Sequence, residues 1–213
     1  MSYSPPELSP AKPHLLPLFA FTLAYMVLSI AMAINAGNKE FIFYIVVMLV
    51  LIGAVSLMHT RVHLTSGLLW ALSLWGLLHM AGGLVPIPSW LPADGEHAVL
   101  YSLWLIPHRL KYDQIVHAYG FGVTTMICWH VLHHGLHDLT GHKPYPTFGL
   151  LVLCMAAGMG FGALNEIVEF IATLTMPSTN VGGYENTGWD LISNLVGSLL
   201  AALLIRLRAK PSV

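Results

Sequence analysis

Residues 158–197 read GMGFGALNEIVEFIATLTMPSTNVGGYENTGWDLISNLVG, two apolar segments joined by a turn rich in Gly and Asn. Glu166 and Glu169 lie in the first segment, and Asp190 lies in the second. A charged side chain at the middle of a bilayer costs about 2.5–3.5 kcal/mol on insertion scales. Three acids around one hairpin therefore predict a shared site, where a partner, a metal ion, water or a proton compensates their charge.

The composition of the whole chain predicts an integral membrane protein. Of its 213 residues, 56% are hydrophobic and 9% are charged, whereas about 25% of the residues of a soluble domain are charged. The formal net charge of −1 gives no indication of nucleic-acid binding. Cys128 and Cys154 both lie inside apolar runs, which disfavours a disulfide framework.

Six segments are long and apolar enough to span a bilayer, which requires about 20 residues. They are expected at Leu15–Ile34, Phe41–Met58, Leu64–Val85, Tyr112–Leu132 with a polar extension to Asp138, Thr147–Leu174 and Trp189–Leu207. The predicted fold is therefore all-α, a polytopic membrane protein with about six transmembrane helices in one bundle. We expect one helical domain over residues 15–207, between a polar, Pro-rich tail (residues 1–14) and a basic tail (residues 208–213).

The link between the third and fourth segments, Pro86–Lys111, is expected to stay at the membrane surface. Its prolines disfavour a regular helix at its start, and its apolar centre, Val99–Ile106, is too short to span a bilayer. Trp90 and Trp104 are of a residue type that prefers the headgroup level. The link is predicted to be an interfacial or re-entrant lid, with an amphipathic surface helix as the plainer alternative.

The distribution of Lys and Arg predicts the orientation, because cytoplasmic loops carry an excess of both. One side of the predicted bundle collects more of these residues than the other. The richer side has Lys12, Arg61, Lys143, Arg206, Arg208 and Lys210, and the poorer side has Lys39, Arg109 and Lys111. Both termini are therefore expected on the cytoplasmic side, with the Pro86–Lys111 link and the Pro177–Gly188 turn facing outward.

Two pairs of polar residues share a helix face at the outer level. Asp113 and His117 are four residues apart, a spacing that suits two metal ligands or a carboxylate that orients an imidazole. Asp190 and Asn194 repeat this spacing in the sixth segment. A helix cap with a hydrogen-bonded core histidine is the structural alternative for the first pair.

Glu166 and Glu169 fall on nearly the same face of the fifth segment, about two to three turns from its outer end. Two neighbouring acids do not both ionise in a low dielectric without a cation. They are expected to share a proton, or to bind a metal ion or a basic partner. The alternative is a structural ion pair or a protonated carboxyl that forms a hydrogen bond.

The topology brings these polar residues to one outer level, together with His79 near the end of the third segment. Oxygen-rich ligands with one or two imidazoles suit Mg²⁺, Mn²⁺, Fe²⁺ or Zn²⁺. The expected metal ligands are His79, Asp113, His117, Glu166, Glu169 and Asp190, and all but His79 are also candidate catalytic residues. The expected supporting residues are Tyr112, Asn165, Tyr184, Asn186, Thr187 and Asn194.

A second cluster, rich in histidine, is expected on the cytoplasmic side. Its members are His59, His63, His130, His133, His134 and His137, with His142 nearby. The spacings H-x-x-x-H and H-x-x-H-H resemble pieces of the histidine boxes of membrane desaturases and hydroxylases, which hold two irons. The plainer interpretation is a solvated, His-rich rim.

Three motifs resemble one family. They are Y-D-x-x-x-H-x-x-G-F from Tyr112, G-A-x-x-E-x-x-E from Gly162 and Y-x-N-T-x-x-D-x-x-x-N-x-x-G from Tyr184. Together they resemble the uncharacterised YjdF-type inner-membrane proteins, and their order is similar to that of the wider VanZ-like group, known from glycopeptide-antibiotic resistance. The resemblance covers Leu64–Leu204 and implies a polytopic protein of the bacterial inner membrane. It implies no established activity.

Three functions remain open at this point. The first is a membrane-embedded enzyme for a lipid or lipid-linked substrate. In it, a metal ion is held by Asp113, His117, Glu166, Glu169 and Asp190, or Glu166 acts as general base with His117 as its acid partner. The second is a proton-coupled transporter or lipid-binding protein that uses the same acids. The third is a structural subunit that packs on a membrane-protein partner or on a second copy of the chain.

Overall fold

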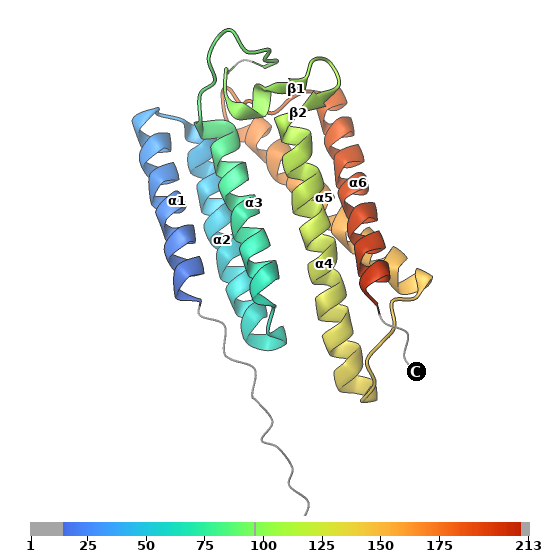
Figure 1. Cartoon of the computed structure of the whole chain (residues 1–213). Coiled ribbons are helices and arrows are strands. Elements are labelled where there is room, and N and C mark those ends of the chain that lie inside the picture. Colours follow the sequence, from blue (N-terminus) through green and yellow to red (C-terminus); the bar gives the residue numbers. More distant parts are fainter. Residues whose placement is uncertain (1–14, 96, 210–213) are drawn as a thin grey trace, which may run out of the picture.

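A computed structural model describes residues 15–95 and 97–209 of the chain (Figure 1). Within these residues, six helices are long and apolar enough to cross a membrane. They are α1 (Leu16–Asn35), α2 (Lys39–Val62), α3 (Ser66–Leu84), α4 (Tyr112–Thr140), α5 (Phe148–Thr175) and α6 (Tyr184–Arg208). This confirms the all-α membrane fold. The expected tail over residues 1–14 and most of the basic tail lie outside the described residues, and Arg208 ends α6.

The described helices begin and end close to their expected positions, with one clear difference. We expected the sixth helix from Trp189, but α6 begins at Tyr184. The N–H of Thr187 donates to the carbonyl of Gly183, so the second half of the expected turn is already helical. Asn186 and Thr187 therefore lie in the first turn of α6, where the helical backbone fixes the direction of their side chains.

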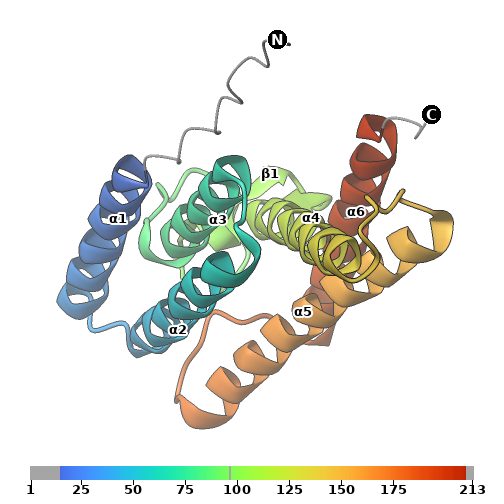
Figure 2. The same ribbon diagram turned by 90° about the horizontal axis from the view of Figure 1, so that it is seen from below.

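The six helices pack as two sets that meet along α3 and α4. Viewed from below, α1, α2 and α3 lie on one side of the molecule, and α4, α5 and α6 lie on the other (Figure 2). The most extensive contact in the bundle joins α4 and α6, and α4 also packs against α3 and α5. The central helix α4 thus contacts α3, α5 and α6, the other helices that were expected to contribute to the outer site.

Glycines allow α4 and α6 to approach backbone to backbone. A side chain at Gly197 would overlap the backbone of Ala118, and a Cβ on Gly122 would lie 3.1 Å from the carbonyl oxygen of Gly197. One turn further from the cap, Thr125 donates a hydrogen bond of 3.0 Å to Ser198. This contact fixes how far the polar residues on α4 stand from those on α6.

The Pro86–Lys111 link forms a folded cap rather than an amphipathic surface helix. It contains η1 (Leu100–Ser102), β1 (Trp104–Ile106) and β2 (Leu110–Lys111), and the two strands pair antiparallel. Single bridges also join Pro86 to Val99 and Ala93 to Leu103. The prolines that prevent a helix here leave these backbone groups to pair across the link instead. The cap covers the end of the bundle where α3 ends and α4 begins (Figure 1).

Candidate functional site

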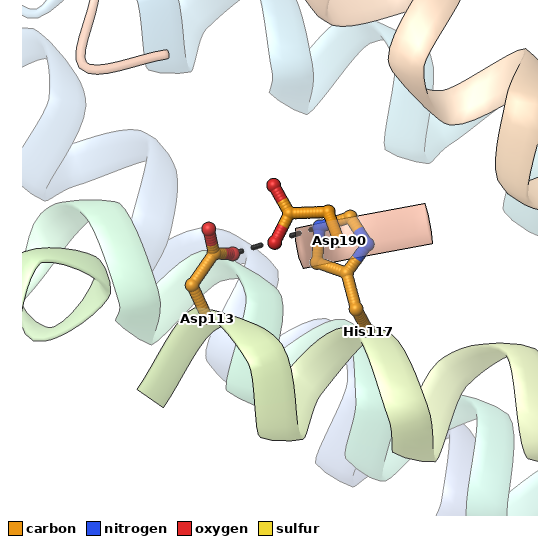
Figure 3. A group of neighbouring side chains, drawn as sticks. All are labelled: Asp113, His117 and Asp190. Atoms are coloured by element: carbon orange, nitrogen blue, oxygen red, sulfur yellow. Dashed lines mark ion pairs between the residues drawn. The ribbon is translucent and has the colours of Figure 1, made fainter. Parts of the chain in front are cut away.

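Two overlapping groups of acids and a histidine lie beneath the cap. The first contains Asp113, His117 and Asp190, and the second contains His117, Glu166 and Glu169. Within each group, one ligand atom from each residue lies within 4.8 Å of those of the other two. Figure 3 shows the first group, with Asp113 and His117 projecting from α4 and Asp190 meeting them from α6. His117 belongs to both groups and is the centre of the site.

His117 is buried and held from three directions. Its Nδ1 lies 3.1 Å from Oδ1 of Asn194 and 3.8 Å from Oε1 of Glu166, and its Nε2 lies 3.6 Å from Oδ1 of Asp113. The Asn194 oxygen accepts a hydrogen bond, so the hydrogen on Nδ1 fixes the tautomer and the orientation of the ring. Nε2 then faces Asp113 with its lone pair, as a metal ligand or a proton acceptor requires.

Glu166 and Asp190 are acids with buried, unsatisfied oxygens. The side chain of Glu166 is 10% exposed, and neither carboxylate oxygen has a hydrogen-bond partner within the described structure. Asp190 is 1% exposed; its Oδ2 accepts a 2.6 Å hydrogen bond from Asn186, while its Oδ1 accepts none from the described residues. Buried polar atoms almost always have partners, since leaving them unpaired is costly. A cation or a proton is therefore needed to compensate these unpaired oxygens.

The neighbouring amide side chains orient the acids and tie them to the cap. Asn165 donates a 2.8 Å hydrogen bond to Oε1 of Glu169. Asn186, which donates to Asp190, accepts a hydrogen bond of 3.3 Å from Nζ of Lys111. That amino group also pairs with Asp94 at 3.0 Å. The cap and the first turn of α6 are therefore linked to the acid cluster through one chain of contacts.

His79 is the one expected metal ligand that belongs to neither group, and Tyr184 is the one expected supporting residue that is exposed. His79 stands next to the cluster, but its Nδ1 lies 2.5 Å from the hydroxyl of Tyr101 and its ring stacks on Trp75. Tyr184 is 95% exposed, so it adds no buried contact to the site. Of the other supporting residues, Tyr112 donates to the carbonyl of Leu78 at 3.0 Å and braces α4 against α3. Thr187 adjoins Glu166 from α6.

A family model described as "Predicted membrane protein (DUF2238)" matches residues 17–211. The chain belongs to this family. The YjdF-type resemblance of its three motifs is consistent with that membership. No curated protein and no solved structure matches the chain. The family and the six apolar helices together identify an integral membrane protein, and the family description names no activity.

One buried acid beside the site was not among the residues expected from the sequence. Glu40 is 6% exposed, and its Oε2 accepts a 2.9 Å hydrogen bond from the backbone N–H of Asn180. It lies in the first turn of α2. An acid in that position is ordinarily an exposed residue that interacts favourably with the helix dipole, so the sequence gives no sign of its burial. The loop before α6 folds over it, so Glu40 anchors that loop beside the site.

Cavities adjoin the site from two sides. A polar cavity of about 640 Å³ opens between the cap and the start of α6, and Asp113 forms part of its lining. A small cavity on the other side is lined by Glu169, Asn165 and His79. It shares Met48, Leu51 and Trp75 with an apolar groove of about 400 Å³ between α1, α2 and α3. The acids thus lie between a polar opening and an apolar groove.

The second histidine cluster lies at the opposite end of the bundle. His134 pairs with Asp138 at 3.0 Å, and Nε2 of His130 lies 3.0 Å from the carbonyl oxygen of Val62. His59 and His63 face each other with ring centroids 6.3 Å apart. In residues 15–95 and 97–209, neither three-residue grouping suited to a metal includes a histidine from this cluster. The structure therefore adds no support for a di-iron centre.

Proposed function

We propose that this protein is a membrane-embedded, metal-dependent enzyme that hydrolyses or otherwise modifies a lipid or lipid-linked substrate. The observation that carries the proposal is the pair of buried, unpartnered oxygens of Glu166 beside His117, in a cluster with three further acids. A cluster of this kind is stable only if a cation or protons neutralise it. Carboxylates with one imidazole form a donor set that suits Mg²⁺, Mn²⁺, Fe²⁺ or Zn²⁺.

The position of each acid and of His117 suggests its role in the proposed reaction. Asp113, His117 and Asp190, one of the two groups, would hold the cation, and the bound cation would polarise a carbonyl or phosphoryl oxygen and activate water. Glu166, whose oxygens are free of hydrogen bonds, would accept the proton of the attacking water. Glu166 would then return that proton to the leaving group, while Nδ1 of His117, 3.8 Å from its Oε1, helps to orient it.

The surroundings favour a lipid or lipid-linked substrate. The acids lie inside a bundle of apolar helices, so the substrate reaches them from the membrane or through the polar cavity beneath the cap. The groove between α1, α2 and α3 shares three wall residues with the cavity at Glu169 and offers a place for a hydrocarbon chain. Its far end is lined by His59 and Thr60 at the end of α2, so a chain there would run away from the acids.

The proposal includes a location. The cap end, which carries the site, faces outward from the bacterial inner membrane, and both termini lie in the cytoplasm. Among the described residues, the end opposite the cap has Arg61, Lys143, Arg206 and Arg208, while the cap end has Lys39, Arg109 and Lys111. This orientation agrees with the positive-inside rule. The order of the three motifs fits a distant relation to the VanZ-like group.

Metal analysis of the purified protein tests the proposal. Wild-type protein equilibrated with Mn²⁺ or Zn²⁺ and then desalted should retain about one ion per chain, and Asp113→Asn and Asp190→Asn should retain at least about tenfold less at equal free metal. Glu185→Gln is the matched control, because Glu185 is an exposed acid on the same helix as Asp190. Wild-type protein without metal, or equal retention in all variants, would refute the metal-dependent enzyme.

The same oxygens also allow a second function. If protons rather than a metal neutralise Glu166 and Asp190, the site would serve a proton-coupled transporter or lipid-binding protein. Lipid binding or flux would then change with pH in metal-free protein, and Glu166→Gln would abolish that pH dependence. Metal retention without pH-dependent binding would exclude this alternative.

A further inference from the structure

The end of the bundle opposite the cap holds a groove that plays no part in the proposed enzyme. It has a volume of about 690 Å³ and lies between α4, the α4–α5 link and the end of α6. Its floor is apolar and its rim is basic. The floor contains Leu68, Met126, Trp129, Leu204 and Ile205, and the rim contains His130, His133, Lys143 and Arg208.

The rim carries positive charge without an acidic counterpart. No Asp or Glu lines the groove within the described residues. Lys143 and Arg208 form no ion pair with a described acid, and the acid at the end of α4, Asp138, pairs instead with His134 and His137. The groove therefore attracts an anion.

The link that forms one wall of the groove is held in place. The guanidinium of Arg206 lies over the ring of Tyr145, 4.7 Å from its centroid, and also donates a hydrogen bond to its hydroxyl. Pro144 and Pro146 flank this tyrosine and stiffen the backbone around it. Lys143 is therefore presented from a fixed segment, which reduces the entropy lost when a ligand binds.

We propose that this groove binds an anionic phospholipid of the surrounding leaflet. The phosphate group would lie between Lys143 and Arg208, and an acyl chain would run along Met126 and Leu204 on the apolar floor. Basic pockets between transmembrane helices are suited to anionic headgroups, and long basic side chains at helix ends reach the headgroup layer. His130 and His133 would then be polar groups on the rim of a lipid-binding site, and not iron ligands.

Lipid competition tests the site. The full chain is reconstituted in nanodiscs that contain equal amounts of phosphatidylglycerol and phosphatidylcholine, and the lipids that stay bound after extraction are counted by native mass spectrometry. Wild-type protein should retain phosphatidylglycerol in preference to phosphatidylcholine. Each basic residue lost should lower that preference about fivefold, so the double variant Lys143→Gln/Arg208→Gln should lose nearly all of it.

Matched variants distinguish the effect of the groove residues on lipid preference from the effect of the protein's overall charge. Lys39→Gln/Arg109→Gln removes the same number of charges at the cap end, where both residues are exposed, and should leave the preference unchanged. Lys143→Arg should retain it. The proposal is overturned if wild-type protein shows no preference, or if the cap-end pair lowers it as much as the groove pair does. All of these residues lie outside the acid cluster, so the metal content of each variant reports on the proposed enzyme separately.

Discussion

Tyr101 illustrates how single residues hold the cap to the site. It lies in η1, its hydroxyl bonds to His79, and a side chain at Gly82 would overlap its ring. Tyr101→Phe would leave a buried imidazole nitrogen unpaired and should lower the free energy of unfolding by about 1–3 kcal/mol. Chemical denaturation in detergent measures this change. Tyr184→Phe, at a 95% exposed position, should change it by less than about 0.5 kcal/mol; equal effects would contradict the assigned contact.

The same tyrosine predicts a pH dependence. Burial raises the pKa of Tyr101 well above its usual value of 10.0, because the anion is poorly solvated there. Since the folded pKa exceeds the unfolded one, the hydroxyl's contribution to stability is complete below pH 10 and is lost as the pH rises further. The free energy of unfolding should fall as the pH rises above about 10, and this fall should be smaller in Tyr101→Phe. An identical alkaline profile in both proteins would contradict the burial of this hydroxyl.

At the level of residues, spacing predicted most of the site. Asp113 with His117, and Asp190 with Asn194, could be assigned to shared faces because helical periodicity is a local property. The short links between helices then placed these faces at one end of the bundle. The sequence could not show that His79 is not among the grouped metal-ligand candidates, because its hydrogen-bond partner Tyr101 lies in the irregular cap. Glu40 was missed for the same reason, as the loop that buries it is distant in sequence.

At the level of elements, the contact between α4 and α6 depends on Gly197. A Cβ there would overlap the backbone of Ala118, which cannot rotate away as a side chain does. Gly197→Ala should therefore destabilise the protein by about 1–3 kcal/mol, and Gly197→Leu by more. Gly188→Ala is the control on the same helix, because a Cβ at Gly188 meets nothing within 4 Å. Thermal unfolding measures the stability of the three variants. A Gly197→Leu variant as stable as the wild-type protein would contradict the backbone contact.

The helices were predictable and the cap was not. Hydrophobic length alone identifies a membrane helix, because no other unclosed structure satisfies its backbone in lipid. The cap instead depends on pairing between Ala93 and Leu103, and between Pro86 and Val99. Such pairs leave no periodic signal in a segment this short and rich in proline. The start of α6 was misplaced because Gly182 and Gly183 favour a turn, while the residues directly after them continue as helix.

At the level of the whole molecule, the even number of helices places the start of α1 and the end of α6 at one end (Figure 1). Cysteine labelling tests which side of the membrane that end faces, in a background with Cys128 and Cys154 changed to Ser. A membrane-impermeant maleimide added to spheroplasts should label Trp90→Cys in the cap and spare Leu139→Cys at the other end; both positions are well exposed, at 78% and 83%. The opposite pattern would reverse the proposed orientation.

The backbone contact at Gly197 also bears on the order of events in the cell. Because α4 and α6 meet through glycine, the spacing of Asp113 and Asp190 is determined by the packing of two helices and does not depend on a bound ion. Small zinc domains behave differently, since they are unfolded until the metal binds. This bundle should therefore insert and fold completely in a metal-poor membrane and bind the proposed ion afterwards. Chelator treatment of the mature protein should then be fully reversible and leave its circular dichroism spectrum unchanged.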